Sequence, residues 1–253
     1  MCLYPKLIKN RKYIPNKKNG GNPPPVSDER VKFVPKACGN CMECRKAKAR
    51  DWQARLAEDI KTNKNAKFVT LTFSDESFAL LASEMPQFSG YFLDNEVATL
   101  AVRRFNERHR KLTGKAIRHW LITELGHEGT ENIHLHGLIW TDLHLDKIEE
   151  LWKYGMMWKG YKMQTTKGQI AYYNYVGPKT VNYITKYVHK QDKDHPHYKP
   201  ITLTSAGIGQ NYTKTYNATK NTFNGKDTNE TYRTLGCFLS LPYAREQSSF
   251  LHP

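Results

Sequence analysis

The chain has 253 residues, a length that accommodates one large or two small domains and can bury a core without disulfides. Lysine and arginine number 39 against 24 aspartates and glutamates, which gives a formal net charge of +15. Such a basic surface favours a polyanionic partner, and 15 tyrosines and 5 tryptophans offer rings on which unpaired bases can stack. Charge alone does not exclude that the protein is basic but binds no nucleic acid.

The sequence contains no signal for a membrane. No apolar run approaches the roughly 20 residues that cross a bilayer, and the N-terminal MCLYPKLIKN lacks the apolar core of a signal peptide. We therefore expect a cytoplasmic protein with no membrane partner. In that reducing compartment, 5 cysteines favour free or metal-bound thiols over a disulfide framework.

The first half of the chain predicts an arm followed by helix, strand and helix. Residues 5–30 are rich in Lys, Asn, Gly and Pro and predict an extended or irregular arm, with ordered structure beginning near residues 38–46. Helical spacing of apolar residues predicts helices over 47–60 and 95–112, the second stopped by Gly114. Alternating β-branched and apolar residues predict a buried strand over 67–73.

The second half predicts a hairpin and then mixed elements. Residues 117–125 and 133–140 are β-rich runs that flank a Gly-rich polar connection, as in a hairpin. The remaining predicted elements are a helix ending at Gly155, an aromatic strand over 156–163, a helix opened by Pro178, a strand at the start of 201–212 and an edge strand over 235–244. Because helices and strands do not alternate regularly, we expect an α+β domain with a central, largely antiparallel sheet flanked by helices.

The second strand of the predicted hairpin, IHLHGLIW, carries two histidines two residues apart. Residues at this spacing share one face of a strand, so His134 and His136 project together while the apolar residues between and beside them point to the other side. Glu124 ends the partner strand, and its carboxylate can sit on the same face. Two imidazoles and one carboxylate leave coordination positions open for water or substrate, as a catalytic ion needs.

The alternative is that both histidines only line a polar end of the sheet. Other metal enzymes fit the pattern less well. A zinc protease helix needs His-Glu-x-x-His, which is absent from the sequence. A cupin-type oxygenase needs a glutamate shortly after the histidine pair, and the segment GLIWTD supplies none.

The segment VNYITKYVHK repeats Tyr-x-x-Lys within one helical pattern. At about 100° per residue, Tyr183, Lys186, Tyr187 and Lys190 fall within one arc of about 100°, and three apolar residues lie opposite, so the phenol-ammonium face is not explained as core. A phenol with a pKa of about 10 attacks poorly at neutral pH unless cations stabilise its phenolate. A lysine one turn away does so and can also bind a phosphate. The alternative is that the tyrosines stack on bases or cap a core edge.

Taken in chain order, three features resemble the HUH endonucleases that start rolling-circle replication: the strand FVTLTF, the His-hydrophobic-His hairpin with an upstream glutamate, and the helix with Tyr-x-x-x-Tyr. The segments MCLYPKL, CGNCMECRKAKARDWQARL and NYITKYVHK look more narrowly like the replication initiators of microviruses, single-stranded DNA phages of the gokushovirus type. The likeness extends over nearly the whole chain and is weakest over 211–229.

The resemblance implies an HUH endonuclease fold with a ferredoxin-like palm, a metal ion and a covalent reaction. The ligands of Mg²⁺ or Mn²⁺ at the scissile phosphate would be Glu124, His134 and His136. The attacking residues would be Tyr183 or Tyr187, with Lys186 and Lys190 beside them. The products would be a 5′-phosphotyrosine link and a free 3′-OH at a replication origin in single-stranded DNA.

The resemblance also implies partners in the cytoplasm of a bacterial host. A host polymerase would extend the 3′-OH, and a host helicase would unwind the DNA, because LTGKAIRHW lacks the residues of a phosphate-cradling loop. Two other functions stay open: a non-catalytic protein that binds single-stranded nucleic acid, and a plasmid initiator or transposase that uses only one tyrosine.

The first part of the chain holds a cysteine motif beside basic residues. Cys38, Cys41 and Cys44 form Cys-x-x-Cys-x-x-Cys, and Cys2 can supply a fourth thiolate for a structural Zn²⁺ that would pin the arm. Free thiols are the alternative, because the spacing departs from the usual paired Cys-x-x-Cys. Cys237 is distant in the sequence, and we expect it to be a core residue. The candidate DNA-binding residues nearby are Arg45, Lys46, Lys48 and Arg50.

Together these features predict three parts of the chain. Residues 1–45 would form a basic arm with the cysteine cluster, and residues 46–200 the HUH endonuclease catalytic domain. Residues 201–253 would form a C-terminal extension that packs on that domain and is partly mobile.

Overall fold

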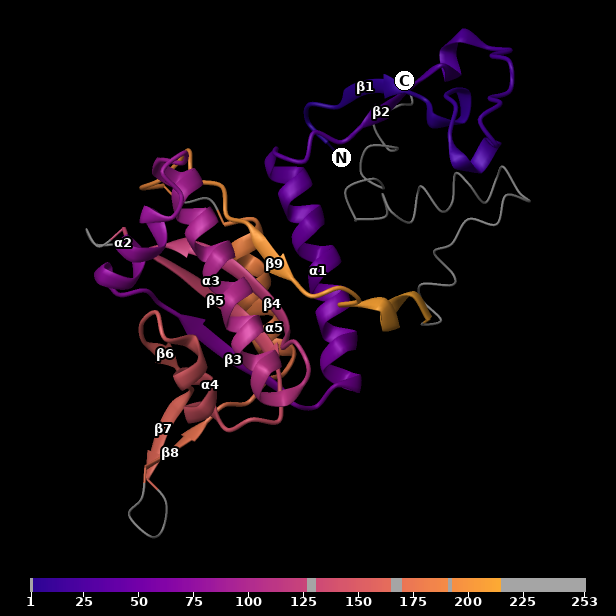
Figure 1. Ribbon diagram of the computed structural model, residues 1–253. Coiled ribbons are helices and arrows are strands. Elements are labelled where there is room, and N and C mark those ends of the chain that lie inside the picture. The colour runs from indigo at the N-terminus through magenta and orange to yellow at the C-terminus, as the bar shows by residue number, and fades with distance from the viewer. Residues whose placement is uncertain (1, 127–130, 165–169, 191–192, 215–253) are drawn as a thin grey trace, which may run out of the picture. The chain divides into compact units, whose positions relative to one another are not determined.

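The computed structural model describes residues 2–126, 131–164, 170–190 and 193–214 (Figure 1). Contacts divide the chain into two units, and the boundary falls within helix α1 (Met42–Thr62), after Lys48. Of the described residues, 2–48 belong to the first unit and 49–214 to the second. The predicted edge strand over 235–244 and Cys237 lie outside the described residues.

The first unit is more regular than its composition predicts. Strand β1 (Lys6–Lys9) pairs antiparallel with β2 (Phe33–Lys36). Between them, 3₁₀ turns at Arg11–Tyr13, Lys17–Asn19 and Glu29–Val31 follow Asn10, Asn16 and Asp28, whose side chains accept hydrogen bonds from the turn backbone. The expectation that ordered structure begins near residues 38–46 is therefore wrong. The polar residues that suggested disorder act as turn caps.

The second unit is built on a five-stranded sheet in which every pair is antiparallel, in the order β6–β3–β5–β4–β9. Its strands are β3 (Ala66–Leu71), β4 (Arg118–Leu125), β5 (Ile133–Trp140), β6 (Met157–Trp158) and β9 (Thr202–Thr204). The predicted α+β class, with an antiparallel sheet flanked by helices, is confirmed. The predicted hairpin strands are also confirmed as the adjacent pair β4 and β5.

Three helices cover one face of this sheet: α2 (Asp75–Ser83), α3 (Gly90–Thr113) and α4 (Leu145–Trp152). Leu121 and Leu135 from the sheet, Phe105 from α3 and Trp152 from α4 are fully buried in the resulting core. Helix α3 ends at Gly114, as predicted, because the left-handed φ of 76° there suits glycine.

The opposite face is covered by residues of α1 from Ala49 onward and by α5 (Pro178–Thr185), which a 3₁₀ turn over Lys186–Val188 prolongs. Leu56, Trp120 and Ile184 are fully buried here. Side chains alternate along a strand, so this face also receives Glu124, His134 and His136. The helix opened by Pro178 is thereby brought over the histidine strand.

A buried carboxylate fastens α1 to the sheet. Asp59 accepts a hydrogen bond from Arg118 on β4 at 2.7 Å, one from the Asn63 side chain at 3.0 Å, and one from the backbone N–H of Gly209. The Asp59 side chain is only 1% exposed. The charge is tolerated at this depth because each contact supplies a donor to the carboxylate.

The segment after α4 differs from the sequence prediction. The helix ends at Trp152, because Lys153 adopts a left-handed φ of 65°, and not at Gly155. The expected single aromatic strand is split at Gly160, whose φ is 123°, into β6 and β7 (Tyr161–Gln164). Strand β7 pairs with β8 (Ile170–Tyr173) in a separate ribbon that projects from the sheet (Figure 1). Neither α2 nor β8 was predicted.

In the part of the chain that the structure describes, no helix combines the length and apolar character that crossing a membrane requires.

Candidate metal centre and tyrosine pair

The β4–β5 hairpin places Glu124 directly opposite His134 in the sheet register. The Oε2 atom of Glu124 lies 2.9 Å from Nε2 of His136 and 3.5 Å from Nε2 of His134. One ligand atom from each of the three side chains lies within 4.8 Å of the other two. The sequence reasoning expected these side chains to share one face, and the structure brings them together.

Each histidine is oriented by a hydrogen bond on its other nitrogen. Nδ1 of His134 lies 3.1 Å from the carbonyl oxygen of Asn132. A carbonyl only accepts, so Nδ1 carries a proton, and Nε2 is the ring atom that faces Glu124. Nδ1 of His136 lies 2.9 Å from the hydroxyl of Thr70 on the neighbouring strand. Such partners fix the ring orientation of metal-binding histidines.

The electrostatics favour an ionised carboxylate at Glu124 beside a neutral imidazole at His136. Burial would raise the pKa of Glu124, but contacts with His134, His136 and Lys190 together hold that pKa well below its usual range. Burial is the largest influence on His136 and lowers its pKa, although Glu124 opposes that shift. A carboxylate and neutral histidines are the protonation states in which these groups bind a cation.

The donor set fits a divalent ion. The buried Nε2 of His136 makes no hydrogen bond within the described residues, although it lies 2.9 Å from Glu124. The two atoms are close, but their direction does not suit an N–H···O bond, so both can face a shared cation. Two nitrogens and a carboxylate suit Mn²⁺, whereas Mg²⁺ prefers oxygen ligands, and three ligands leave positions for a phosphate.

The tyrosine pair lies against this cluster. The ring of Tyr187 stacks on His136, with centroids 4.9 Å apart and planes inclined by 5°. Its hydroxyl donates a hydrogen bond of 2.7 Å to the hydroxyl of Tyr183. Tyr183 is 41% exposed, whereas Tyr187 is 7% exposed and belongs to the core cluster of that face.

The expectation that the whole phenol-ammonium face lies outside the core is therefore wrong for Tyr187. The 3₁₀ turn that follows α5 packs onto the sheet, so the second tyrosine becomes both a core residue and a neighbour of the histidines. Burial, the bond to Tyr183 and the charge of Glu124 all raise the pKa of Tyr187 above its ordinary value. The apolar back of the helix is buried as predicted, through Val181, Ile184 and Val188.

The two lysines of the helix also lie at the site. Nζ of Lys186 lies 4.2 Å from the ring centroid of Tyr183 and 5.3 Å from that of Tyr187. Nζ of Lys190 lies 2.7 Å from Oε1 of Glu124 and 5.4 Å from the Tyr187 ring. Both ammonium groups are thus close enough to stabilise a negative charge on a phenol oxygen or on a bound phosphate.

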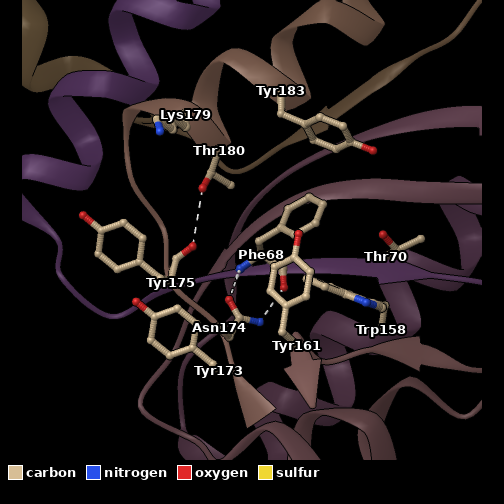
Figure 2. Close-up of a pocket in the computed structure, with 10 residues that line it drawn as sticks. All are labelled: Phe68, Thr70, Trp158, Tyr161, Tyr173, Asn174, Tyr175, Lys179, Thr180 and Tyr183. Carbon is tan, nitrogen blue, oxygen red and sulfur yellow. Dashed lines mark hydrogen bonds between the residues drawn. The ribbon is translucent and has the colours of Figure 1, made fainter. Parts of the chain in front are cut away.

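An aromatic pocket of about 580 Å³ adjoins Tyr183, which forms part of its wall (Figure 2). The ring of Phe68 meets Trp158 edge to face at 5.2 Å and Tyr183 at 5.9 Å. The other lining residues are Thr70, Tyr161, Tyr173, Asn174, Tyr175, Lys179 and Thr180. The sequence analysis missed this pocket, although the density of aromatic residues between 158 and 175 was a signal for it.

Asn174 lines the pocket and is hydrogen-bonded to strand β3. Its side chain accepts a hydrogen bond of 2.9 Å from the backbone N–H of Phe68 and donates one of 2.7 Å to the carbonyl of the same residue. It also donates to the carbonyl of Lys159 at 3.0 Å. The amide therefore pairs with the edge of β3 as a neighbouring strand would, which holds the chain leading into α5 beside the sheet.

The candidate DNA-binding residues all lie on α1. Lys48 and Arg50 are exposed, and Arg45 and Lys46 are partly buried, with Lys46 3.5 Å from Glu43. Their contact with DNA stays a prediction.

Comparison with known proteins gives one match. A family model of replication-associated proteins matches residues 66–192. No curated protein and no solved structure matches the chain. The matched segment is half of the chain, starts with β3, and contains the carboxylate, both histidines and both tyrosines. The chain therefore belongs to this family of replication-associated proteins.

Proposed function

We propose that the chain is a metal-dependent endonuclease and strand-transfer enzyme of the HUH type. It would nick single-stranded DNA at a replication origin and initiate rolling-circle replication of a small phage genome of the microvirus type. The observation that carries the proposal is the convergence of Glu124, His134 and His136 within 4.8 Å, with the Tyr187 ring stacked on one of these histidines. Membership of a family of replication-associated proteins supports the same reading.

The reaction exchanges one phosphodiester for another. A phenol oxygen loses its proton and attacks the phosphorus, the bond from phosphorus to the 3′-oxygen breaks, and that oxygen takes up a proton as it leaves. The products are a 5′-phosphotyrosine and a free 3′-OH, which a host polymerase can extend. Because the number of phosphodiester bonds is conserved, no nucleotide cofactor is needed.

The residues of the site divide this work between them. A divalent ion held by Glu124, His134 and His136 would draw electron density from the scissile phosphate and offset its charge. Lys186 is placed beside both phenols, so its ammonium can stabilise a phenolate as it develops. Lys190 binds Oε1 of Glu124, whereas Oε2 faces the histidines. The lysine can therefore hold the carboxylate in its orientation.

We assign the first attack to Tyr183. It is 41% exposed and lines the pocket, whereas Tyr187 is 7% exposed beneath it. The hydroxyl of Tyr187 donates to that of Tyr183, so a negative charge on the Tyr183 oxygen has a donor already in place. Tyr187 then remains for the second cut, which releases the regenerated origin while the first tyrosine still holds DNA.

The aromatic pocket supports single-stranded DNA as the substrate. Rings of Trp158, Tyr161 and Tyr183 border a space of about 580 Å³, and unpaired bases stack on such rings whatever their sequence. Duplex DNA keeps its bases paired and offers none to this pocket. Unwinding of duplex DNA is assigned to a host helicase.

A nicking assay tests the proposal. A labelled single-stranded origin oligonucleotide incubated with Mn²⁺ should give a covalent protein–DNA adduct that survives denaturing electrophoresis. Mass spectrometry should place the modified tyrosine at residue 183 or 187. The Tyr183→Phe, Tyr187→Phe double variant should form no adduct but still bind the oligonucleotide. A wild-type protein that binds the oligonucleotide and never cleaves it, with Mn²⁺ or Mg²⁺, would identify a non-catalytic single-strand binding protein instead.

A further inference from the structure

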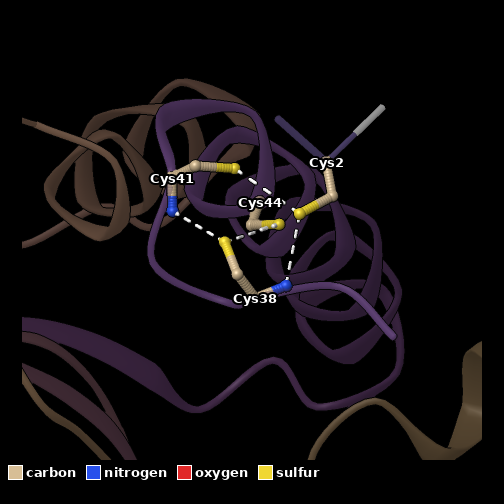
Figure 3. A group of neighbouring side chains, drawn as sticks. All are labelled: Cys2, Cys38, Cys41 and Cys44. Carbon is tan, nitrogen blue, oxygen red and sulfur yellow. Dashed lines mark hydrogen bonds between the residues drawn. The ribbon is translucent and has the colours of Figure 1, made fainter. Parts of the chain in front are cut away.

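Four cysteines of the first unit converge on one point (Figure 3). One Sγ atom from each of Cys2, Cys38, Cys41 and Cys44 lies within 4.8 Å of the other three. The Sγ atoms of Cys38 and Cys44 are 3.9 Å apart, as are those of Cys41 and Cys2. The proposed nuclease site uses none of these residues.

Three local structures bring the four thiols together. The β1–β2 pair sets Lys6 opposite Lys36, which carries the chain end with Cys2 to the segment that begins at Cys38. Gly39 then adopts a left-handed φ of 79°, so the chain turns sharply between Cys38 and Cys41. Helix α1 starts at Met42 and presents Cys44 from its first turn.

The spacing of the sulfurs suits a tetrahedral ion. With Zn–S bonds of about 2.3 Å, the sulfurs of a Zn–Cys₄ site are separated by about 3.8 Å. The Cys38–Cys44 and Cys41–Cys2 pairs are each 3.9 Å apart, and every other pair lies within 4.8 Å. A disulfide needs about 2.05 Å between sulfurs. The cluster is therefore arranged as a set of four separate ligands and not as two bridges.

Backbone donors point at the same sulfurs. The N–H of Cys38 donates to Sγ of Cys2 at 3.2 Å, and the N–H of Cys41 donates to Sγ of Cys38 at 3.3 Å. Hydrogen bonds of this kind stabilise a thiolate more than a thiol, because the sulfur accepts through its negative charge. Thiolates are the form in which cysteine binds a metal.

The described part of this unit has no buried apolar core of its own. Among the described residues 2–48, no aliphatic or aromatic side chain is buried, and six of the eight residues of β1 and β2 are exposed. A two-stranded ribbon without a buried apolar face is marginal in water, and small units of this kind depend on metals or disulfides for their stability. Within residues 2–48, the four cysteines can supply a metal site of this kind.

We propose that Cys2, Cys38, Cys41 and Cys44 bind one structural Zn²⁺ that joins the N-terminal end of the chain to the start of α1. Four thiolates close the coordination shell, so the ion has a structural and not a catalytic role. The soft sulfur set also separates this ion from the one assigned to Glu124 and the histidines, because thiolates do not suit Mg²⁺ or Mn²⁺.

The test measures metal in the full chain and does not depend on nuclease activity. Purified protein, dialysed against metal-free buffer, should carry one zinc per chain by elemental analysis. The Cys38→Ser, Cys41→Ser double variant should lose this zinc. The Cys237→Ser variant, which removes the fifth cysteine of the sequence, and the His134→Ala, His136→Ala variant should both retain it.

A second measurement keeps the test independent of how well the cysteine variant folds. Exchange of the wild-type metal for Co²⁺ should produce the thiolate charge-transfer and tetrahedral absorption bands of a Co–S₄ site. Limited proteolysis should cut within residues 2–40 faster after the zinc is stripped by a chelator. Wild-type protein without zinc and without the cobalt bands, or zinc that persists in the Cys38→Ser, Cys41→Ser variant, would overturn the proposal whatever the nicking assay shows.

Discussion

The imidazole of His136 and the phenol of Tyr187 lie in nearly parallel planes, with ring centroids 4.9 Å apart. One ring belongs to the central strand β5 and the other to the 3₁₀ turn that ends α5. Their stacking fixes a candidate metal ligand against a candidate nucleophile in one rigid contact. The Tyr187 hydroxyl also donates a hydrogen bond to the hydroxyl of Tyr183, so this contact connects the histidine cluster to both tyrosines.

The first prediction concerns the ligands themselves. Glu124→Ala or His136→Ala should reduce Mn²⁺ affinity by at least about 100-fold and abolish adduct formation, because each change removes one of three ligand atoms. Calorimetric titration with Mn²⁺ measures the first effect and the oligonucleotide assay the second. His197→Ala, at an exposed histidine outside the cluster, is the matched control and should change neither. Full Mn²⁺ affinity in Glu124→Ala would show that the ion binds elsewhere.

The second prediction isolates the orientation of a ligand. Thr70→Val keeps the shape of the side chain and removes the hydroxyl that lies 2.9 Å from Nδ1 of His136. We expect Mn²⁺ to bind about 10-fold to 100-fold more weakly, the usual cost of losing such a partner. Addition of excess Mn²⁺ should restore cleavage, which would not happen if the substitution damaged the fold. Unchanged affinity would mean that stacking on Tyr187 alone orients the ring.

The core of the candidate site was predictable because it depends on local rules. The period of two along a strand places His134 and His136 on one face, and the hairpin register adds Glu124. The burial of Tyr187 was not predictable from the helical wheel. The wheel gives the relative directions of Tyr183 and Tyr187, but the distance between the sheet and the end of α5 decides which of them is covered. That distance is set by tertiary packing.

The same limit explains which elements of the fold were missed. The periodic segments of β3, α3, β4 and β5 were predicted because each buries a regular apolar face. Strands β1 and β2 have no such face; asparagine side chains cap the turns between them, and the pair brings four cysteines together. The prediction that α4 ends at Gly155 is wrong, because the helix ends at Trp152. That glycine is instead required where the chain passes β3, since a Cβ there would lie 2.5 Å from the carbonyl oxygen of Thr72.

The third prediction separates the roles of the two tyrosines. Tyr183→Phe should lose the first cleavage, because it removes the exposed phenol. Tyr187→Phe should still cleave, more slowly because the donor to Tyr183 is lost, and should fail to rejoin the strand. Adduct formation and circle closure on a substrate with two origins measure the two steps. Tyr175→Phe, which removes a hydroxyl elsewhere in the pocket lining, should leave both steps intact. If Tyr187→Phe retains closure, the enzyme uses one tyrosine, as a plasmid initiator or transposase would.

The fourth prediction addresses the aromatic pocket. Tyr161 is 73% exposed and meets Trp158 edge to face at 5.6 Å, so its replacement should not disturb the core. Tyr161→Ala should weaken binding of single-stranded DNA by about 1–2 kcal/mol, the scale of one base–aromatic stack. The slope of affinity against salt concentration should stay the same, because no charge is removed. Phe92→Ala, at an exposed ring on α3 outside the pocket, is the control. Equal losses in both variants would remove the pocket from the binding site.

The fifth prediction tests the buried carboxylate that fastens α1 to the sheet. Asp59→Ala leaves the guanidinium of Arg118, the amide of Asn63 and the N–H of Gly209 without their shared acceptor. Breaking a buried ion pair from one side costs about 3–5 kcal/mol. Arg118 retains 31% exposure and can turn toward water. We therefore expect the free energy of unfolding to fall by about 3 kcal/mol, the lower end of that range, in chemical denaturation.

Glu58→Ala is the control, because it removes a neighbouring carboxylate whose partner, Lys61, is 66% exposed. That change should cost less than about 1 kcal/mol. Similar losses in the two variants would mean that Asp59 contributes no more than a surface charge, and that apolar packing alone holds α1 on the sheet.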